Sequence, residues 1–332
     1  DVTLDGPIWL GTANLEDAAK SITLDLNGHN VSMTGGDAST DYYMFALTHG
    51  ELLVRNSSAT PSNVQLTGIS KHGTAIFNVF GSYRSSRWNE AGSAPEGNAI
   101  NTRESGYISH LEIGENVNIL LGSNCLGTGI VVNALVANSG PLKGKEINYF
   151  ANLFNKNYGY AYGARVDVYG NINVLGISSG ENKAYGIKVN GTVRSPREPN
   201  TVRTTKMGGV DNNYLINFAD NIAGHANDTI DAPYVYVHRG SNIVTNNGST
   251  KSAAIYASGY AKWLIEGHCE GNIGISASSG TIALNDAEIE STATTYAPPT
   301  GGNSVSGSGS ALVVNSRDGY SGDMEVTISG NT

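Results

Sequence analysis

Short segments of alternating apolar and polar residues recur along the chain, and each ends in a turn rich in Gly and Asn. Clear copies are Ile22–Leu26 before Asn27-Gly28, Lys262–Glu266 before Gly267, and Glu325–Ser329 before Gly330. Such a strand has one apolar face, which a segment of three to five residues cannot bury alone. Two or three short strands and their corners, repeating about every 20 residues, make one coil of a stack. The repeats therefore predict an all-β parallel β-helix, in which each coil covers the apolar face of its neighbour.

Residues 21–31 show how one repeat is expected to lie in the coil. We expect Leu24 and Leu26 to point into the stack and Thr23 and Asp25 to point outward, because successive side chains of a strand alternate. Asn27-Gly28 should turn the corner, since Gly adopts left-handed backbone angles freely and Asn tolerates them. Just before this repeat, residues 14–20 are predicted to form a short N-terminal capping helix, because an Asn N-cap precedes Glu and Asp.

Composition supports this fold class and excludes some partners. Of 332 residues, 42 are Gly and 39% are hydrophobic, while only 15% are charged. This composition is too apolar for a disordered chain and suits a β-rich protein with many turns. A net charge of −9 argues against nucleic acid as a partner, because phosphate-backbone binders depend on Lys and Arg. No apolar run approaches the roughly 20 residues of a membrane span, so we expect a soluble chain. We also expect a single domain over residues 1–332.

Three polar stretches interrupt the repeats, near residues 81–106, 139–162 and 195–232. Long loops in a compact repeat fold are usually functional or mobile, so we interpret these stretches as insertions that project from the coils. Aromatic rings in a polar context can stack on a sugar while their polar groups stay hydrated. The alternative, that these rings pack the insertions against the coils, stays open. The candidate ligand-binding residues are Tyr83, Arg84, Arg87, Trp88, Tyr158, Tyr160 and Tyr162.

Cysteines and histidines give no sign of a metal site. Cys125 and Cys269 lie far apart and lack the paired spacing of zinc ligands. We interpret them as two buried thiols, with a disulfide between them as the alternative. Tyr256, Tyr260 and Trp263 occupy repeat positions and are expected to be structural. The sequence predicts no metal ion and no cofactor.

Three strings give the chain a resemblance to a known family. Ile22–His29, Ile255–Trp263 and Ser279–Asn285 resemble the right-handed parallel β-helix, pectin-lyase-like repeats of bacterial cell-surface and adhesin-like proteins. The resemblance covers residues 1–70 and roughly residues 230–332. It implies a fold and a surface location but no particular ligand, because many functions share one scaffold.

Catalysis of the kind that pectin-lyase-like folds often carry is not predicted. The related glycoside hydrolases pair an Asp-Asp with a Gly-His-Gly turn, and neither string occurs in this chain. The three Gly-His pairs, at 28–29, 224–225 and 267–268, are interpreted as corner or surface histidines. A lyase would need a basic residue near carboxylates, and the acidic and basic residues of 194–231 are the candidates for that alternative.

The sequence therefore favours a non-catalytic, extracellular or cell-surface β-helix of adhesin type that binds a glycan or another surface partner. A polysaccharide lyase or glycoside hydrolase of the same fold is one alternative. A structural fibre or filament component of a phage or cell surface, assembled as a homo-oligomer, is the other.

Overall fold

The computed structural model describes most of the repeat segments and consists of strands and turns there. It describes residues 1–10, 21–37, 42–47, 50–70, 74–81, 109–134, 164–176, 184–189, 234–245, 252–257, 261–278, 280–300, 305–315 and 324–332. Within these ranges no helix forms, and therefore no helix long and apolar enough to cross a bilayer is found. The predicted capping helix at 14–20 lies outside the described residues.

Three sheets of eight parallel strands run side by side along the stack. Sheet A contains β1 (Val2–Leu4), β4 (Val31–Gly36), β7 (Ser62–Ile69), β10 (Val117–Leu121), β13 (Asn171–Val174), β16 (Asn242–Thr245), β19 (His268–Gly271) and β22 (Glu288–Ser291). Sheet B contains β2 (Ile8–Leu10), β5 (Tyr43–Leu47), β8 (Ala75–Gly81), β11 (Thr128–Ala134), β14 (Tyr185–Val189), β17 (Ala253–Ala257), β20 (Ile273–Ala277) and β23 (Ser310–Val314). Sheet C contains β3 (Ser21–Asp25), β6 (Gly50–Arg55), β9 (Ser109–Ile113), β12 (Ala164–Val168), β15 (Tyr234–Val237), β18 (Lys262–Ile265), β21 (Thr281–Asn285) and β24 (Glu325–Ser329).

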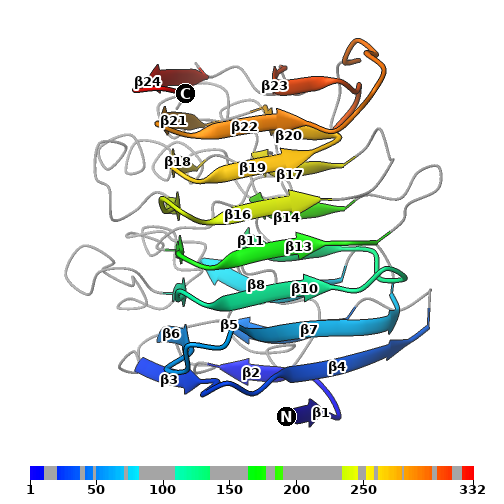
Figure 1. Ribbon diagram of the computed structural model, residues 1–332, viewed down its shortest axis with the longest axis vertical. Helices are drawn as coiled ribbons and strands as arrows, with labels where there is room; N and C mark the ends of the chain where they lie inside the picture. Colours follow the sequence, from blue (N-terminus) through cyan, green and yellow to red (C-terminus); the bar gives the residue numbers. More distant parts are fainter. Residues whose placement is uncertain are drawn as a thin grey trace, which may run out of the picture.

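The chain visits the three sheets in turn and then starts the next coil. Strands β1, β2 and β3 form the first coil, and every later group of three repeats the order A, B, C. The coils lie one above another from the N-terminus to the C-terminus (Figure 1). This arrangement confirms the predicted fold class, an all-β parallel β-helix, with three strands in each coil.

Aligned apolar side chains fill the interior of the stack. In sheet B the strand register places one inward residue of each coil directly on that of the next, from the first coil to the last. The rings of Phe45 and Phe77 stack within this column, with centroids 5.1 Å apart. Every coil thus buries its apolar face against its neighbours, as a solenoid requires. The column consists of Ile8, Phe45, Phe77, Ile130, Ile187, Ile255, Ile275 and Leu312.

The corner after β3 has the predicted conformation. Leu26 is buried and Leu24 packs against the core, while Thr23 and Asp25 are exposed. Asn27 and Gly28 have φ angles of 46° and 82°, in the left-handed region.

The corner after β6, in the next coil, forms a hydrogen bond with the corner after β3. The Gly28 amide donates a hydrogen bond of 2.9 Å to Oδ1 of Asn56, and Asn56 Nδ2 donates one of 3.1 Å to the Asn116 carbonyl. Asparagine therefore recurs at these corners partly because its amide joins one coil to the next.

Other predictions have mixed outcomes. Cys125 and Cys269 are both buried and free, which confirms two thiols and excludes the disulfide. Tyr256 and Trp263 are buried, as expected of structural residues, whereas Tyr260 lies outside the described residues.

The predicted repeat length of about 20 residues was wrong for most coils. It holds between β18 and β21, but elsewhere longer connections at the corners separate successive coils.

Candidate functional site

Polar and aromatic side chains gather on the outer face of sheet C, where the repeat pattern predicts only solvated residues. Inward positions of these strands carry Val, Leu and Ile, so the alternate positions face outward. Register aligns these outward positions from strand to strand over β6, β9, β12, β15 and β18. We call this group the sheet C cluster; it consists of Glu51, His110, Arg165, Asp167, Tyr169, Tyr234, Tyr236, His238 and Glu266.

Asp167 lies at the centre of the sheet C cluster. It occupies an outward position of β12, yet its side chain is only 2% exposed because its neighbours cover it. Arg165 donates from Nε at 2.6 Å and from Nη2 at 3.1 Å, one bond to each carboxylate oxygen. Nε2 of His110 lies 2.8 Å from Oδ2, and Nε2 of His238 lies 3.1 Å from Oδ1. An ionised carboxylate only accepts hydrogen bonds, so both imidazoles donate from Nε2.

These bonds keep Asp167 ionised. Burial alone would raise the pKa of its carboxyl group, but the hydrogen bonds from His110, Arg165 and His238 and the charge of Arg165 lower that pKa far below its ordinary value. A carboxylate with three donors cannot also take a proton from a substrate. Asp167 therefore holds its neighbours in place and is not a candidate for the general base.

His110 bridges two carboxylates. Its Nδ1 lies 2.9 Å from Oε1 of Glu51, and its Nε2 bonds to Asp167. Burial acts to lower the pKa of His110, but the hydrogen bonds and charges of Asp167 and Glu51 outweigh it and raise that pKa above 6.5. Glu51 has a lowered pKa because it accepts a hydrogen bond from Ser21 and faces His110, despite its partial burial. Folding thus favours the protonated form of His110 relative to the unfolded chain.

A pH-dependent stability follows from His110. A group whose pKa is raised on folding stabilises the fold fully below its unfolded pKa, near 6.5, and loses that contribution as the pH rises through its higher folded value. We expect the melting temperature of the wild type to fall through this group as the pH rises from about 6.5 through the higher folded pKa of His110, and His110→Gln to flatten the decline. Scanning calorimetry at a series of pH values measures both slopes. His29→Gln, at the corner after β3, is the matched control; equal slopes for the two variants would contradict the assignment.

Three rings stack beside Asp167. The ring of His238 lies between those of Tyr169 and Tyr236, with centroid distances of 3.6 Å and 3.4 Å and interplanar angles of 17° and 27°. Tyr234 meets Tyr236 edge to face at 6.4 Å, and the guanidinium of Arg165 lies over the Tyr234 ring at 5.5 Å. Tyr169 is 37% exposed, so this end of the stack offers ring surface to a ligand.

Tyr236 joins the rings to a second carboxylate. Its hydroxyl donates a hydrogen bond of 2.5 Å to Oε2 of Glu266, and Nδ2 of Asn285 donates one of 2.7 Å to Oε1 of the same residue. Burial, followed by the bond to Glu266, raises the pKa of Tyr236 to about 12. The same two hydrogen bonds lower the pKa of Glu266. Tyr236 is therefore a protonated donor at neutral pH and Glu266 an ionised acceptor.

Three carboxylates of the sheet C cluster differ from the acid of a glycoside hydrolase. A glycoside hydrolase needs one carboxylic acid that stays protonated near neutral pH, which requires a raised pKa. The pKa values of Glu51, Asp167 and Glu266 are all lowered. What the cluster offers on its outer face is the partly exposed ring of Tyr169, with the other rings and charged groups fixed around it.

The site residues predicted from the sequence cannot be compared with the structure. Tyr83, Arg84, Arg87, Trp88, Tyr158, Tyr160 and Tyr162 all lie outside the described residues, and their role stays a prediction. The same holds for the lyase candidates of 194–231 and for His225. Of the three predicted insertions, only Gly81 is described, as the last residue of β8.

Strand order nevertheless relates the predicted insertions to the sheet C cluster. Three of the undescribed segments, 82–108, 135–163 and 190–233, follow β8, β11 and β14 of sheet B and precede β9, β12 and β15 of sheet C. Those three sheet C strands are neighbours and carry His110, Asp167 and Tyr236. The segments that we predicted to be functional thus lead directly into the strands of the cluster.

Sequence reasoning missed the sheet C cluster itself. Val166–Gly170 and Tyr234–His238 are recognisable as repeats, and their outward residues are one Asp, three Tyr and one His, so that rings follow one another in successive repeats. That succession of rings in neighbouring repeats was the available signal.

No family model, no curated protein and no solved structure matches this chain.

Proposed function

We propose that the protein binds a glycan on the outer face of sheet C without cleaving it, as a secreted or cell-surface parallel β-helix of adhesin type. The observation that carries the proposal is the buried, ionised Asp167, which fixes His110, Arg165 and His238 through four hydrogen bonds. A binding surface gains affinity when its groups are held in place before the ligand arrives.

The ring stack supplies the second support. Tyr169 offers an exposed face, and His238 and Tyr236 hold it from behind. Aromatic faces with polar edges are the side chains that stack on sugars most readily. The adhesin-like resemblance of the repeats agrees with a surface location and indicates no particular ligand.

A glycan panel with a parallel cleavage assay tests this function. We expect the wild-type protein to bind at least one class of acidic or neutral polysaccharide, and to release neither reducing ends nor unsaturated ends from any of them. Release of either product would favour the hydrolase or lyase alternative. A stable trimer or polymer in light scattering, with no glycan bound, would favour the fibre alternative.

A further inference from the structure

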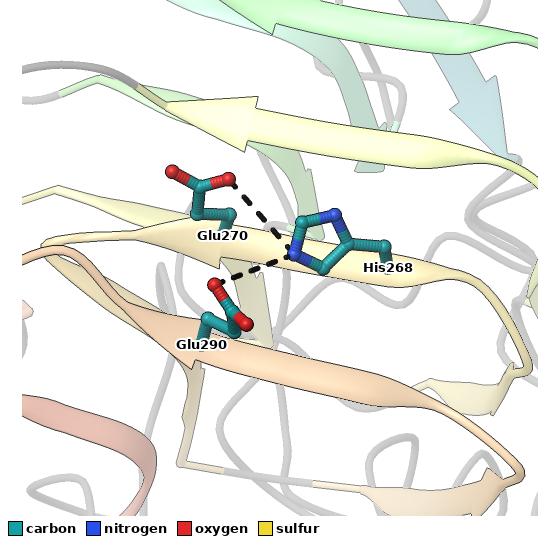
Figure 2. A group of neighbouring side chains, drawn as sticks. All are labelled: His268, Glu270 and Glu290. Carbon is teal, nitrogen blue, oxygen red and sulfur yellow. Dashed lines mark ion pairs between the residues drawn. The ribbon is translucent and has the colours of Figure 1, made fainter.

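A second cluster of polar side chains lies on the outer face of sheet A, away from sheet C. His268 and Glu270 are two residues apart on β19 and point outward, since Cys269 between them is buried. Glu290 on β22 lies directly opposite Glu270 in the strand register. Figure 2 shows that both carboxylates turn toward the same ring nitrogen of His268.

The distances in this cluster match a shared cation better than direct hydrogen bonds. Nε2 of His268 lies 3.9 Å from Oε2 of Glu270 and 3.9 Å from Oε2 of Glu290, and one ligand atom from each residue lies within 4.8 Å of the others. A hydrogen bond would need about 3 Å. Two ligand atoms bonded to one metal ion at about 2.1 Å lie at most about 4.2 Å apart, so the two 3.9 Å distances fit a shared ion and a pair at the 4.8 Å limit has to close by about 0.6 Å when the ion binds.

Nε2 of His268 is also without a partner for a hydrogen bond. The atom is shielded from solvent and makes no hydrogen bond, although two carboxylates face it. Like charges directly opposite each other on neighbouring strands destabilise a sheet, and a cation between Glu270 and Glu290 would relieve this repulsion. An unpaired, shielded nitrogen between two carboxylates has the arrangement of a metal ligand.

A ladder of asparagines sets the tautomer of His268. On sheet A, Asn118 Nδ2 donates to Asn63 Oδ1 at 3.2 Å, Asn171 Nδ2 to Asn118 Oδ1 at 3.0 Å, and Asn242 Nδ2 to Asn171 Oδ1 at 3.0 Å. Every amide therefore points its oxygen toward the following coil.

The last amide oxygen of the ladder, on Asn242, faces the ring of His268. Asn242 Oδ1 lies 3.4 Å from Nδ1 of His268. An amide oxygen only accepts, so Nδ1 carries the proton and the neutral ring keeps its lone pair on Nε2, toward Glu270 and Glu290. A partner that holds the far nitrogen and fixes the tautomer is the usual second contact of a metal-binding histidine.

We propose that His268, Glu270 and Glu290 bind a divalent first-row transition metal ion such as Zn²⁺. One imidazole nitrogen and two carboxylate oxygens are ligands of Zn²⁺ and its neighbours, whereas Ca²⁺ and Mg²⁺ prefer oxygen alone. Glu290 is 54% exposed, so water can complete the coordination. The ion joins β19 to β22, which belong to successive coils, and thereby stabilises this end of the stack.

Titration of Zn²⁺ into the full chain after chelator treatment tests the proposal. We expect one Zn²⁺ bound per chain through this cluster, an affinity at least tenfold weaker in Glu290→Gln, and loss of binding in His268→Gln. We also expect a rise in melting temperature with Zn²⁺ that a chelator reverses, because at about 100 times Kd the ion lowers the unfolded fraction about 100-fold.

Glu288→Gln is the matched control. Glu288 lies on the same strand as Glu290, opposite His268, and is exposed. Its replacement by Gln removes the same charge as Glu290→Gln. The affinity of Glu288→Gln should stay within about twofold of the wild type. The proposal is overturned if the wild type binds no Zn²⁺, which would leave an ion pair only. It is equally overturned if Glu290→Gln and Glu288→Gln bind alike, or if binding persists in His268→Gln.

Discussion

Replacing Asp167 with alanine is expected to lower the free energy of unfolding by about 3 kcal/mol, because it removes a buried carboxylate and leaves three partly buried donor side chains without their acceptor. Arg165, His110 and His238 all bond to this one carboxylate, whose side chain is only 2% exposed. The midpoint of denaturant unfolding at neutral pH measures the loss.

Asp5→Ala removes a carboxylate that is exposed, and it should leave the midpoint close to that of the wild type. If the two variants unfold at the same denaturant concentration, Asp167 does not hold the sheet C cluster together. Its three donors would then be satisfied equally well without it.

Phe77→Ala is expected to cost about 4 kcal/mol, the range typical of a large aromatic side chain removed from a packed core. Phe77 is 1% exposed, stacks on Phe45 of the preceding coil and lies in register with Ile130 of the following coil. The cavity interrupts the central column of sheet B, where neighbouring coils supply one another's packing. Denaturant unfolding followed by circular dichroism reports the change.

Ile69→Ala serves as the control for this column, because Ile69 ends β7 with 48% of its surface exposed. We expect a change within about 0.5 kcal/mol. Similar losses at Phe77 and Ile69 would mean that burial in the column does not dominate the stability of the stack.

The fold could be predicted from the sequence because its determinants are local. Alternation assigned Leu24 and Leu26 to the interior, and Asn27-Gly28 identified a corner from backbone preference alone. The length of a coil, in contrast, is not determined by a short stretch of sequence. Corner connections vary in length without disturbing the strands, so a fixed period described only part of the chain.

The site depends on contacts between coils, which the sequence does not display. Alternation places Asp167 outward and thus suggests a solvated carboxylate, but His110 and His238 come from the coils on either side and cover it. Long segments separate these residues along the chain, so their register is known only once the strands are paired. His268 was predicted to be a corner or surface histidine for the same reason, because Glu290, on the next coil, is what makes it a ligand candidate.

Titration of the glycan selected from the panel into wild type and Tyr169→Ala tests the central claim most directly. Tyr169 presents the exposed ring of the stack, and we expect its removal to weaken binding about tenfold, the loss of one stacking contact. Tyr296→Ala is the matched control, since Tyr296 is 69% exposed and lies outside the sheet C cluster; it should bind as the wild type does. Equal affinities of the wild type and Tyr169→Ala would contradict the assignment of sheet C as the binding face.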